Sequence, residues 1–466
     1  MSHKFDLIVL GAGPAGMSAA RSARALGLDV AVVDEQPAPG GQVWRNVEQA
    51  TARRAAEAFG SDYEAGAELA GSFRTCGATY LTNTQVWQIE PGFRVYTRNG
   101  GDLDILFGRM LLIATGALER AVPFPGWTLP GVMTVGAAQI LMKSADEIPD
   151  RPVWIAGSGP LTLLYATQLL EAGGAIQGIL DTAPRANRYR ALPHAMRALA
   201  CRDELLKGMR WIRHLRRSAI PIIRDVTEIE ALGESQVEGI RFRTTGGNES
   251  TVPATLLLVH EGVVSDIHMT LALGCRHEWH DAQQCFVPTL DEWGETSEQG
   301  AFVAGDGSGI GGVRSACAAG EIAALAIARA LGRLSAAEAQ QAAHEPRRRR
   351  ARALALRPFL DELYRPRSQL AHPADDTIVC RCEHVTAGAI RTAARGAAGD
   401  PNQVKAATRC GMGPCLGRVC SLTVAHVIAD TSGRSVAETG VYRVRPPLRP
   451  ITLAQLASIE GKEIAA

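Results

Sequence analysis

The stretch FDLIVLGAGPAGMSAARSARALGLDVAVVDE, from Phe5 to Glu35, decides the fold of this chain. A short apolar run ends in the turn Gly11-Ala12-Gly13-Pro14-Ala15-Gly16, an alanine-rich segment follows, and a second apolar run ends at Asp34. Strand, glycine-rich turn, helix and strand in this order are typical of the first βαβ unit of a Rossmann-type domain. The first glycine makes the tight turn, the second lets the backbone approach a pyrophosphate, and the third lets helix and strand pack closely. The stretch therefore predicts a dinucleotide site.

The ends of this unit supply the polar contacts that a dinucleotide needs. A helix that begins near Pro14 offers free N–H groups and the positive end of its dipole to the phosphates. Asp34 stands 18 residues after Gly16, where it can accept hydrogen bonds from a ribose diol, and Glu35 is the alternative acid. The predicted contacts of this unit are Gly11, Gly13, Pro14, Ala15, Gly16, Asp34 and Glu35.

Three later stretches bear on which dinucleotide is bound. LLIATGAL is an apolar strand that ends in Ala114-Thr115-Gly116, and GAFVAGDGSG is a strand that ends in Gly305-Asp306. An apolar helix is expected from about Val313 to Leu331. PGGQVWR runs from Pro39 to Arg45. With the first glycine loop, these stretches resemble the two-dinucleotide-binding-domain flavoproteins of the glutathione-reductase-like superfamily.

That resemblance implies FAD as the cofactor of the first domain. It places Asp306 on the ribityl chain and the segment that contains Gly41 and Gln42 beside the flavin. The further contacts that it implies are Thr115, Gly116 and Gly305.

A second glycine loop departs from the pattern of the first. PVWIAGSGPLTLLYATQLLEAGGAIQGILD, residues 152–181, repeats the strand, turn and helix, but Thr162 stands at the third glycine position. Counted as in the first loop, the acid position falls on Leu180, with Asp181 one residue late. A leucine cannot accept from a ribose hydroxyl, so a degenerate NAD(P)-type domain is expected, with functional NAD(P)H binding as the alternative. The chain has no C-x-x-C pair, which argues against a disulfide relay.

The overall composition of the chain excludes several other classes of protein. The net charge of +1 gives no electrostatic footprint for nucleic acid. The sequence contains no run of 18 apolar residues, so no transmembrane helix is expected. The first strand leaves no room for a signal peptide, so a cytoplasmic location is expected. Residues 336–374 carry Arg347 to Arg350 and are expected to form a basic linker, in which prolines argue against a single long helix. A docking surface for a partner subunit or for anionic lipid, and hence a location peripheral to the inner membrane, is the alternative.

Half of the ten cysteines lie in the 41 residues from Cys380 to Cys420. Cys380-x-Cys382 is followed, after 27 residues, by Cys410-x4-Cys415, with Cys420 as an extra candidate. Four thiolates from two tight turns suit zinc or an iron–sulfur cluster. A C-x-C pair is tighter than the usual zinc knuckle, which favours a cluster with two adjacent irons.

VCRCEHVTAGAIRTA and KAATRCGMGPCLGRVC, read together, resemble the bacterioferritin-associated-ferredoxin-type (BFD-like) [2Fe–2S] domain. With the FAD half, they are similar to the flavoprotein subunits of heteromeric, dye-linked amino-acid dehydrogenases, which include hydrogen cyanide synthase, the opine oxidases and D-hydroxyproline dehydrogenase. The resemblance implies Cys380, Cys382, Cys410 and Cys415 as ligands, while Cys420 could replace Cys410 or Cys415.

The same resemblance implies a division of labour between subunits. A D-amino-acid-oxidase-like (DAO-like) FAD beta subunit would oxidise the C–N bond, and this chain would pass electrons to a quinone or dye. A small ferredoxin-like subunit is a further candidate partner. No separate constellation of catalytic acid, base or nucleophile stands out in the sequence, which agrees with an electron-transfer role. A self-sufficient NAD(P)H-dependent flavoprotein reductase and a zinc-bearing scaffold are the alternatives.

The expected fold class is α/β, with two Rossmann-type domains and a small C-terminal helical domain. Residues 1–120 and 285–335 are expected to bind FAD, and residues 121–284 to form the inserted NAD(P)-type domain. The basic linker spans 336–374, the BFD-like domain 375–435, and a C-terminal tail 436–466.

Overall fold

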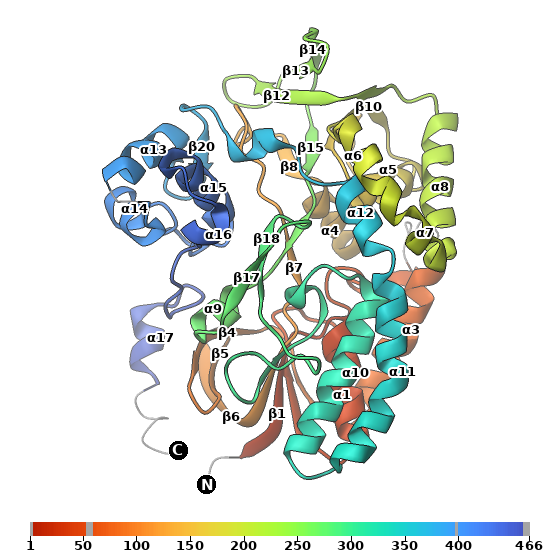
Figure 1. The fold of residues 1–466 in the computed structure, drawn as a ribbon, viewed down its shortest axis with the longest axis vertical. Helices are drawn as coiled ribbons and strands as arrows, with labels where there is room; N and C mark the ends of the chain where they lie inside the picture. Colours follow the sequence, from red (N-terminus) through yellow and green to blue (C-terminus); the bar gives the residue numbers. More distant parts are fainter. Residues whose placement is uncertain (1–2, 53–58, 397–398, 460–466) are drawn as a thin grey trace.

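The computed structural model describes residues 3–52, 59–396 and 399–459. Two α/β bodies lie one above the other in Figure 1, and a helical C-terminal module lies beside them. This is the predicted fold class. Residues 460–466 of the predicted tail, and residues 397–398 of the predicted BFD-like domain, lie outside the described residues.

The first sheet carries the first glycine loop at the end of its central strand. Its order is β3-β2-β1-β6-β5-β4, with β19 also paired to β6. The strands are β1 (Lys4–Leu10), β2 (Val30–Val33), β3 (Thr79–Leu81), β4 (Thr84–Glu90), β5 (Arg94–Asn99), β6 (Asp102–Ile113) and β19 (Ala301–Val303). β1, β2, β3, β19 and the end of β6 run parallel, so their C-terminal ends meet at one edge. Ligands of such sheets bind at that edge.

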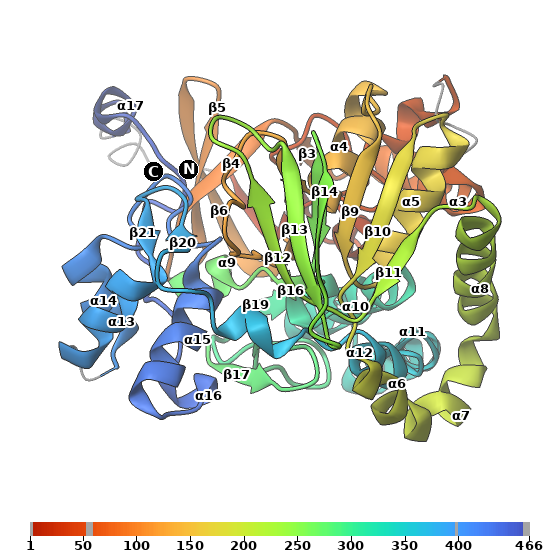
Figure 2. The same ribbon diagram turned by 90° about the horizontal axis from the view of Figure 1, so that it is seen from above.

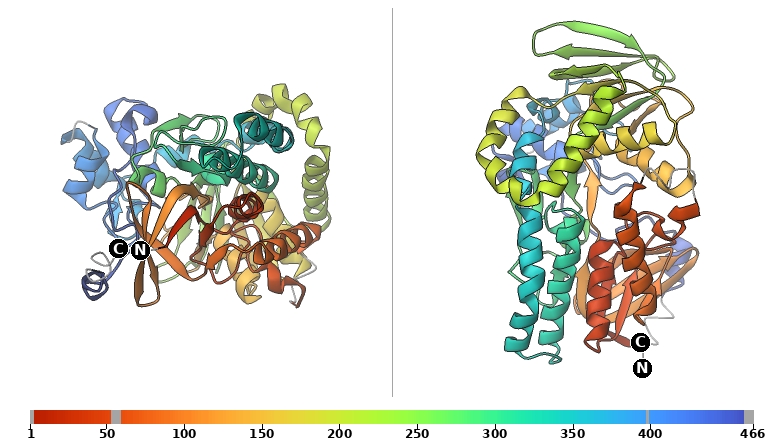
Figure 3. Two further views of the ribbon diagram at one scale, coloured as in Figure 1. Left: turned by 90° about the horizontal axis from the view of Figure 1, so that it is seen from below. Right: turned by 90° about the vertical axis from the view of Figure 1, so that its right-hand side faces the viewer.

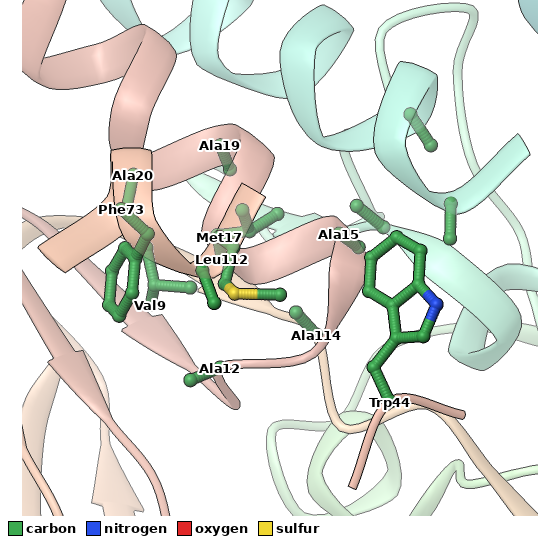
Figure 4. Close-up of a cluster of buried hydrophobic side chains, with 14 of the residues drawn as sticks. Val9, Ala12, Ala15, Met17, Ala19, Ala20, Trp44, Phe73, Leu112 and Ala114 are labelled. Atoms are coloured by element: carbon green, nitrogen blue, oxygen red, sulfur yellow. The ribbon is translucent and has the colours of Figure 1, made fainter. Parts of the chain in front are cut away.

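Helix α1 (Pro14–Ala25) packs between this sheet and α10 (Val313–Ala330), as the right-hand view of Figure 3 shows, because small residues let the helices approach closely. A Cβ at Gly320 of α10 would lie 2.1 Å from the carbonyl oxygen of Ala15. Figure 4 shows Met17 pointing into the cluster of buried side chains around Leu112, with Trp44 at one side. This packing fixes the start of α1, and with it the glycine loop.

A second parallel sheet has the order β11-β10-β9-β15-β8. Its strands are β8 (Val132–Thr134), β9 (Val153–Gly157), β10 (Ile176–Asp181), β11 (Ile222–Arg224) and β15 (Leu257–His260). Helices α4 (Val135–Ala145), α5 (Pro160–Glu171) and α8 (Arg202–Arg217) accompany it, and an antiparallel meander follows: β12 (Val226–Leu232), β13 (Gly239–Thr244) and β14 (Glu249–Pro253). The chain enters through β7 (Ala117–Glu119) and leaves through β16 (Val263–Ser265), which pair with each other.

Much of the segment expected to be a basic linker is helical. Helix α11 (Ala336–Leu354) starts with a capping box formed by Ser335 and Glu338, and α12 (Arg357–Leu363) follows. Pro346 lies inside α11, yet the helix continues because its alanine face packs on α10. The break between α11 and α12 agrees with the expectation that no single long helix spans this segment, but Pro346 does not interrupt α11. Packing outweighs the hydrogen bond that one proline removes.

The C-terminal module begins with the hairpin β20 (Ile378–Cys380) and β21 (Val385–Thr386). Its helices are α13 (Ala387–Gly396), α14 (Pro401–Thr408), α15 (Ser421–Ser432) and α16 (Val436–Thr439). The Trp127 indole N–H donates to the carbonyl oxygen of Ile378 at 2.6 Å, which ties the module to the second body. Beyond the module the chain returns to the first sheet, where the N–H of Leu448 donates to the Trp87 carbonyl, and ends in α17 (Leu453–Ala457).

Candidate cofactor sites

The first glycine loop has the conformation that its sequence predicts. Gly11 has φ +102°, and a Cβ there would lie 2.6 Å from the Ala114 carbonyl oxygen, so the residue must be glycine. A Cβ on Gly16 would lie 1.9 Å from the carbonyl oxygen of Gly11. A Cβ on Gly13 would meet a single protein atom within 4 Å, the Gly41 Cα at 3.7 Å. Space around the loop is therefore closed at its first and third glycines and open at its second.

The two candidate acids lie in different environments. The Asp34 carboxylate is 7% exposed and accepts from the N–H groups of Ala12, at 2.5 Å, and Gln36, at 2.7 Å. Burial raises the pKa of Asp34, against the lowering effect of these two donors. Glu35 is more exposed and pairs with Arg449 at 3.1 Å. Asp34 is the acid that lies against the glycine loop.

The later signatures converge on the same loop. A Cβ on Gly305 would lie 3.0 Å from the Cβ of Ala15 in the first turn of α1. Asp306 Oδ1 accepts from the N–H groups of Gly311 and Gly312, at 2.9 and 3.0 Å. The hydroxyl of Thr115 is buried and, within the described residues, has no hydrogen-bond partner. A buried Thr115 hydroxyl without a partner, and the close approach of Gly305 to the first glycine loop, fit a polar ligand bound at this edge of the sheet.

The PGGQ segment crosses the first loop, with Gly41 in the left-handed region at φ +62°. Gln42 accepts from Arg45 at 2.9 Å, and Arg45 also donates to Gln36. Lys143 of α4 reaches this segment from the second body and donates to the carbonyl oxygens of Gln42 and Val43. Burial lowers the pKa of Lys143 to about 7. Sequence reasoning missed Lys143, because a helix more than a hundred positions away supplies it.

The second loop keeps its acid, contrary to the residue count. β10 has a register shift between Ile176 and Gly178, and this shift brings Asp181 opposite Gly157. In the first loop the corresponding neighbours are Gly11, which donates to the Val33 carbonyl, and Asp34, which follows β2. The expectation that Leu180 holds the acid position is therefore wrong. Leu180 is fully buried in the core of the second body.

A buried histidine lies at this second loop. The His260 ring is 2% exposed, and its Nε2 is 3.5 Å from the position that a Cβ on Gly159 would take. His260 Nδ1 is 2.6 Å from the Glu119 carboxylate, which also accepts from the N–H of Gly136 in the first turn of α4. Thr162, at the third glycine position, is buried within α5. The second loop is thus more crowded by side chains than the first.

The five C-terminal cysteines fall into two groups. The Sγ atoms of Cys380, Cys410 and Cys420 lie within 4.8 Å of one another, and all three residues are buried. The thiols of Cys410 and Cys420 donate to the Cys380 sulfur and hold the pKa of Cys380 well below its usual range. Cys382 is exposed and shares a hydrogen bond with Cys415. The four predicted cysteines thus fall into two groups, Cys380 with Cys410 and Cys382 with Cys415, and Cys420 belongs to the buried group.

Glycines let the second cysteine turn close over the first. A Cβ on Gly413 would lie 2.3 Å from the Cβ of Cys382. The N–H of Gly411, which has φ +88°, donates to the Cys380 sulfur. Several sulfur donors and a backbone N–H directed at one of them fit a thiolate-bound metal or cluster.

A cavity of about 70 Å³ lies where the cysteine module contacts the rest of the protein. Leu118, Ser265 and Phe286 line it on the side of the first body, and Leu416 and Gly417 on the side of the cysteine turn. The hydroxyl of Ser265 donates to the carbonyl oxygen of Asp306 at 2.8 Å, and Leu416 directly follows Cys415. The cysteine module therefore meets the segment beside Asp306 at one small, mostly apolar space.

Comparison with known families gives two matches. Residues 5–323 match the pyridine nucleotide-disulphide oxidoreductase family, and residues 375–459 match the sarcosine oxidase A3 domain. The first match includes both glycine loops, and the second includes all five C-terminal cysteines. Among the described residues, no helix is both long enough and apolar enough to cross a membrane.

Two relatives are similar over almost their whole length. The A subunit of opine oxidase from Rhizobium meliloti (strain 1021) is 41% identical, across 98% of this chain and 99% of that protein. The HcnB subunit of hydrogen cyanide synthase from Pseudomonas aeruginosa is 30% identical, across 97% and 98%.

Among solved structures, L-proline dehydrogenase from P. horikoshii has a TM-score of 0.70 at 20% identity, covering 97% of this chain and 79% of that one. Thioredoxin reductase of T. acidophilum has a TM-score of 0.51 at 18% identity, covering 70% and 98%. These two likenesses confirm the fold.

Proposed function

Because this chain belongs to the pyridine nucleotide-disulphide oxidoreductase family, within the group of the opine oxidase and HcnB flavoprotein subunits, we propose that it is the electron-transferring subunit of a heteromeric amino- or imino-acid dehydrogenase. It is an FAD-dependent oxidoreductase by family. The proposed substrates are opines, hydroxyproline or glycine, oxidised at a C–N bond in a partner subunit. The proposed acceptor is a quinone or, in vitro, a dye.

The first body supplies the proposed FAD contacts. Gly11, Gly13, Pro14, Ala15 and Gly16 would hold the pyrophosphate against the start of α1, and Asp34, rather than Glu35, the adenosine ribose. Asp306 would hold the ribityl chain. The other proposed contacts are Gly41, Gln42, Thr115, Gly116 and Gly305. FAD exchanges electrons singly or in pairs, which suits a subunit that links a two-electron substrate to a one-electron carrier.

Cys382 and Cys415 are proposed to bind one iron of a [2Fe–2S] cluster, and Cys380 and Cys420 the other. Cys420 is proposed in place of Cys410, the ligand inferred from the sequence, because the two residues lie at different ends of their helices. Cys420 is the N-terminal cap residue of α15, whereas Cys410 follows the C-terminal end of α14. The positive end of a helix dipole favours an anionic cluster and its negative end disfavours one. Such a cluster carries one electron at a time.

The cavity between Ser265 and Leu416 is the observation that carries this proposal. Ser265 on one wall donates to the carbonyl oxygen of Asp306, which is proposed to hold the flavin, and Leu416 on the other wall directly follows the proposed ligand Cys415. A short, mostly apolar contact between the two parts suits electron exchange between groups bound on either side.

The proposed domain division follows the sequence: residues 1–120 and 285–335 bind FAD, 121–284 form the inserted domain, and 375–435 the cluster domain. Both relatives, from opine oxidase and from hydrogen cyanide synthase, are named as subunits, which supports a multisubunit assembly. A DAO-like FAD subunit, and a small ferredoxin-like subunit, are the proposed partners. The proposed location is cytoplasmic.

Co-expression with a DAO-like FAD subunit tests the division of labour. The purified complex is expected to reduce a dye with one of the candidate amino acids, because the partner oxidises the substrate and this chain passes on the electrons. The chain alone is expected to show less than about a hundredth of that rate. Equal dye reduction by the chain alone would contradict the proposal.

A second candidate function, an NAD(P)H-dependent reductase, is favoured by one observation: Asp181 lies opposite Gly157, where a ribose-binding acid belongs. Against it stand the buried His260 ring at Gly159 and the β-branched Thr162. We expect that NADH and NADPH, mixed anaerobically with the holoprotein, leave the flavin absorbance unchanged over seconds. Bleaching within the dead time of a stopped-flow mixer would favour the second candidate.

A further inference from the structure

Residues 185–217 form a helical lobe of unusual charge, here called the α6–α8 lobe. It comprises α6 (Arg185–Ala191), α7 (Ala195–Ala198) and α8, joined by short turns. Ten lysines and arginines stand against two acidic residues in these 33 positions, a net charge of +8. Since the whole chain has a net charge of +1, the remaining residues carry −7. The lobe lies at the opposite side of the molecule from the cysteine module (Figures 1 and 2).

The same lobe exposes large apolar side chains. Met196 is 78% exposed, Tyr189 75% and Leu192 63%, and Leu199, Leu206 and Met209 are each more than half exposed. These six are half of the twelve large apolar side chains that are exposed in the part of the chain that the structure describes. Scattered single apolar residues need no explanation, but a cluster of them among many cations indicates a binding surface.

Helix α8 shows how the two kinds of side chain share one face. Its inner side contacts the body, where Leu215 is buried and Lys207 pairs with Asp62 of α3 (Ser61–Thr75). Its outer side exposes Leu206 and Met209 and then, one to two turns further along, an arginine cluster. Within residues 3–52, 59–396 and 399–459 the structure records no ion pair for the following arginines of this helix: Arg202, Arg210, Arg213, Arg216 and Arg217.

We propose that the α6–α8 lobe docks this chain on an anionic lipid surface. Leucine, methionine and tyrosine side chains can enter the headgroup region while arginines bind lipid phosphates beside them. A second copy of the lobe is a poor occupant, because two surfaces of +8 repel each other. A protein partner would need acidic groups matched in position to these arginines, because polar groups left imperfectly paired at an interface lower the affinity. A bilayer supplies negative charge without such matching, and the proposal stands whether or not the chain transfers electrons.

Vesicle flotation with the full-length protein tests the proposal. Wild type is expected to float with vesicles of phosphatidylcholine containing about a quarter phosphatidylglycerol, to stay behind with pure phosphatidylcholine, and to be released by about 0.5 M salt. The triple variant Arg210→Gln, Arg213→Gln, Arg217→Gln is expected to partition about a hundredfold more weakly. A second variant, Met196→Gln with Leu206→Gln and Met209→Gln, keeps the charge and is expected to lose about as much binding.

The matched control removes three exposed arginines elsewhere: Arg395→Gln, Arg443→Gln and Arg445→Gln. It is expected to float like wild type, and circular dichroism checks that every variant is folded. Hydrogen exchange on vesicles is expected to protect residues 185–217. Equal weakening by the control and the lobe variant, or no flotation of wild type, would overturn the proposal. If the co-expressed complex failed to float while the isolated chain did, a partner subunit would cover the lobe, which would also overturn it.

Discussion

Alanine in place of Gly13 is expected to weaken flavin binding and leave the fold intact. Gly13 has φ −76° and ψ −175°, a conformation that alanine adopts without strain. Its new Cβ would meet one protein atom within 4 Å, so the protein itself has room for it. A pyrophosphate bound at the loop has no such room, because the second glycine exists to let it approach. Overpacking by one methyl group costs about 1–3 kcal/mol, so FAD affinity is expected to fall by about ten- to a hundredfold.

Two further glycine variants serve as comparisons for Gly13→Ala. Gly71→Ala, on the exposed side of α3, adds a Cβ with nothing within 4 Å and is expected to keep the flavin and gain about 1 kcal/mol of stability. Gly16→Ala would place its Cβ 1.9 Å from the Gly11 carbonyl oxygen, so both flavin and folding are expected to suffer. Flavin content and urea midpoints separate the three variants. An FAD dissociation constant of Gly13→Ala equal to that of wild type would show that the pyrophosphate does not lie over this loop.

Replacement of Cys420 by serine is expected to cost the protein most of its iron, whereas the same change at Cys410 is expected to leave the cluster in place. The two residues make a matched pair, since both are buried and both lie within 4.8 Å of Cys380. They differ in their helix ends, because Cys420 begins α15 and Cys410 follows α14. Metal ligands contribute many kcal/mol, so the loss at Cys420 is expected to be nearly complete.

Iron, sulfide and visible absorbance of the purified variants measure this difference. Cys382→Ser and Cys415→Ser are expected to lose the cluster like Cys420→Ser. Cys76→Ser is the control for the loss of a thiol, because Cys76 is far from the module in sequence. The opposite pattern, with iron lost at Cys410 and retained at Cys420, would restore the ligand set inferred from the sequence.

Local spacing made the first glycine loop predictable. Its glycines, helix and acid lie within one continuous stretch, and the fold class that they indicated is confirmed by the family match and the solved structures. The FAD contacts named from these motifs stay predictions. So does the choice of cluster ligands, although the structure brings the predicted cysteines together.

Features that depend on tertiary geometry could not be predicted from local spacing in the sequence. The register shift in β10 moves Asp181 opposite Gly157, and no residue count shows such a shift. The contact of Lys143 with the Gln42 carbonyl joins two bodies of the protein. Pro346 suggested a helix break, but the packed alanines of α11 override it. The division of the cysteines into a buried and an exposed group depends on how one glycine-rich turn closes over another.

Cofactor content of the full-length protein, purified without oxygen, tests the central claim most directly. We expect about one FAD, about two iron and about two acid-labile sulfide per chain. We also expect that both groups are reduced when substrate is added to the complex with the partner subunit. Flavin without iron or sulfide, or zinc in place of iron, would contradict the account.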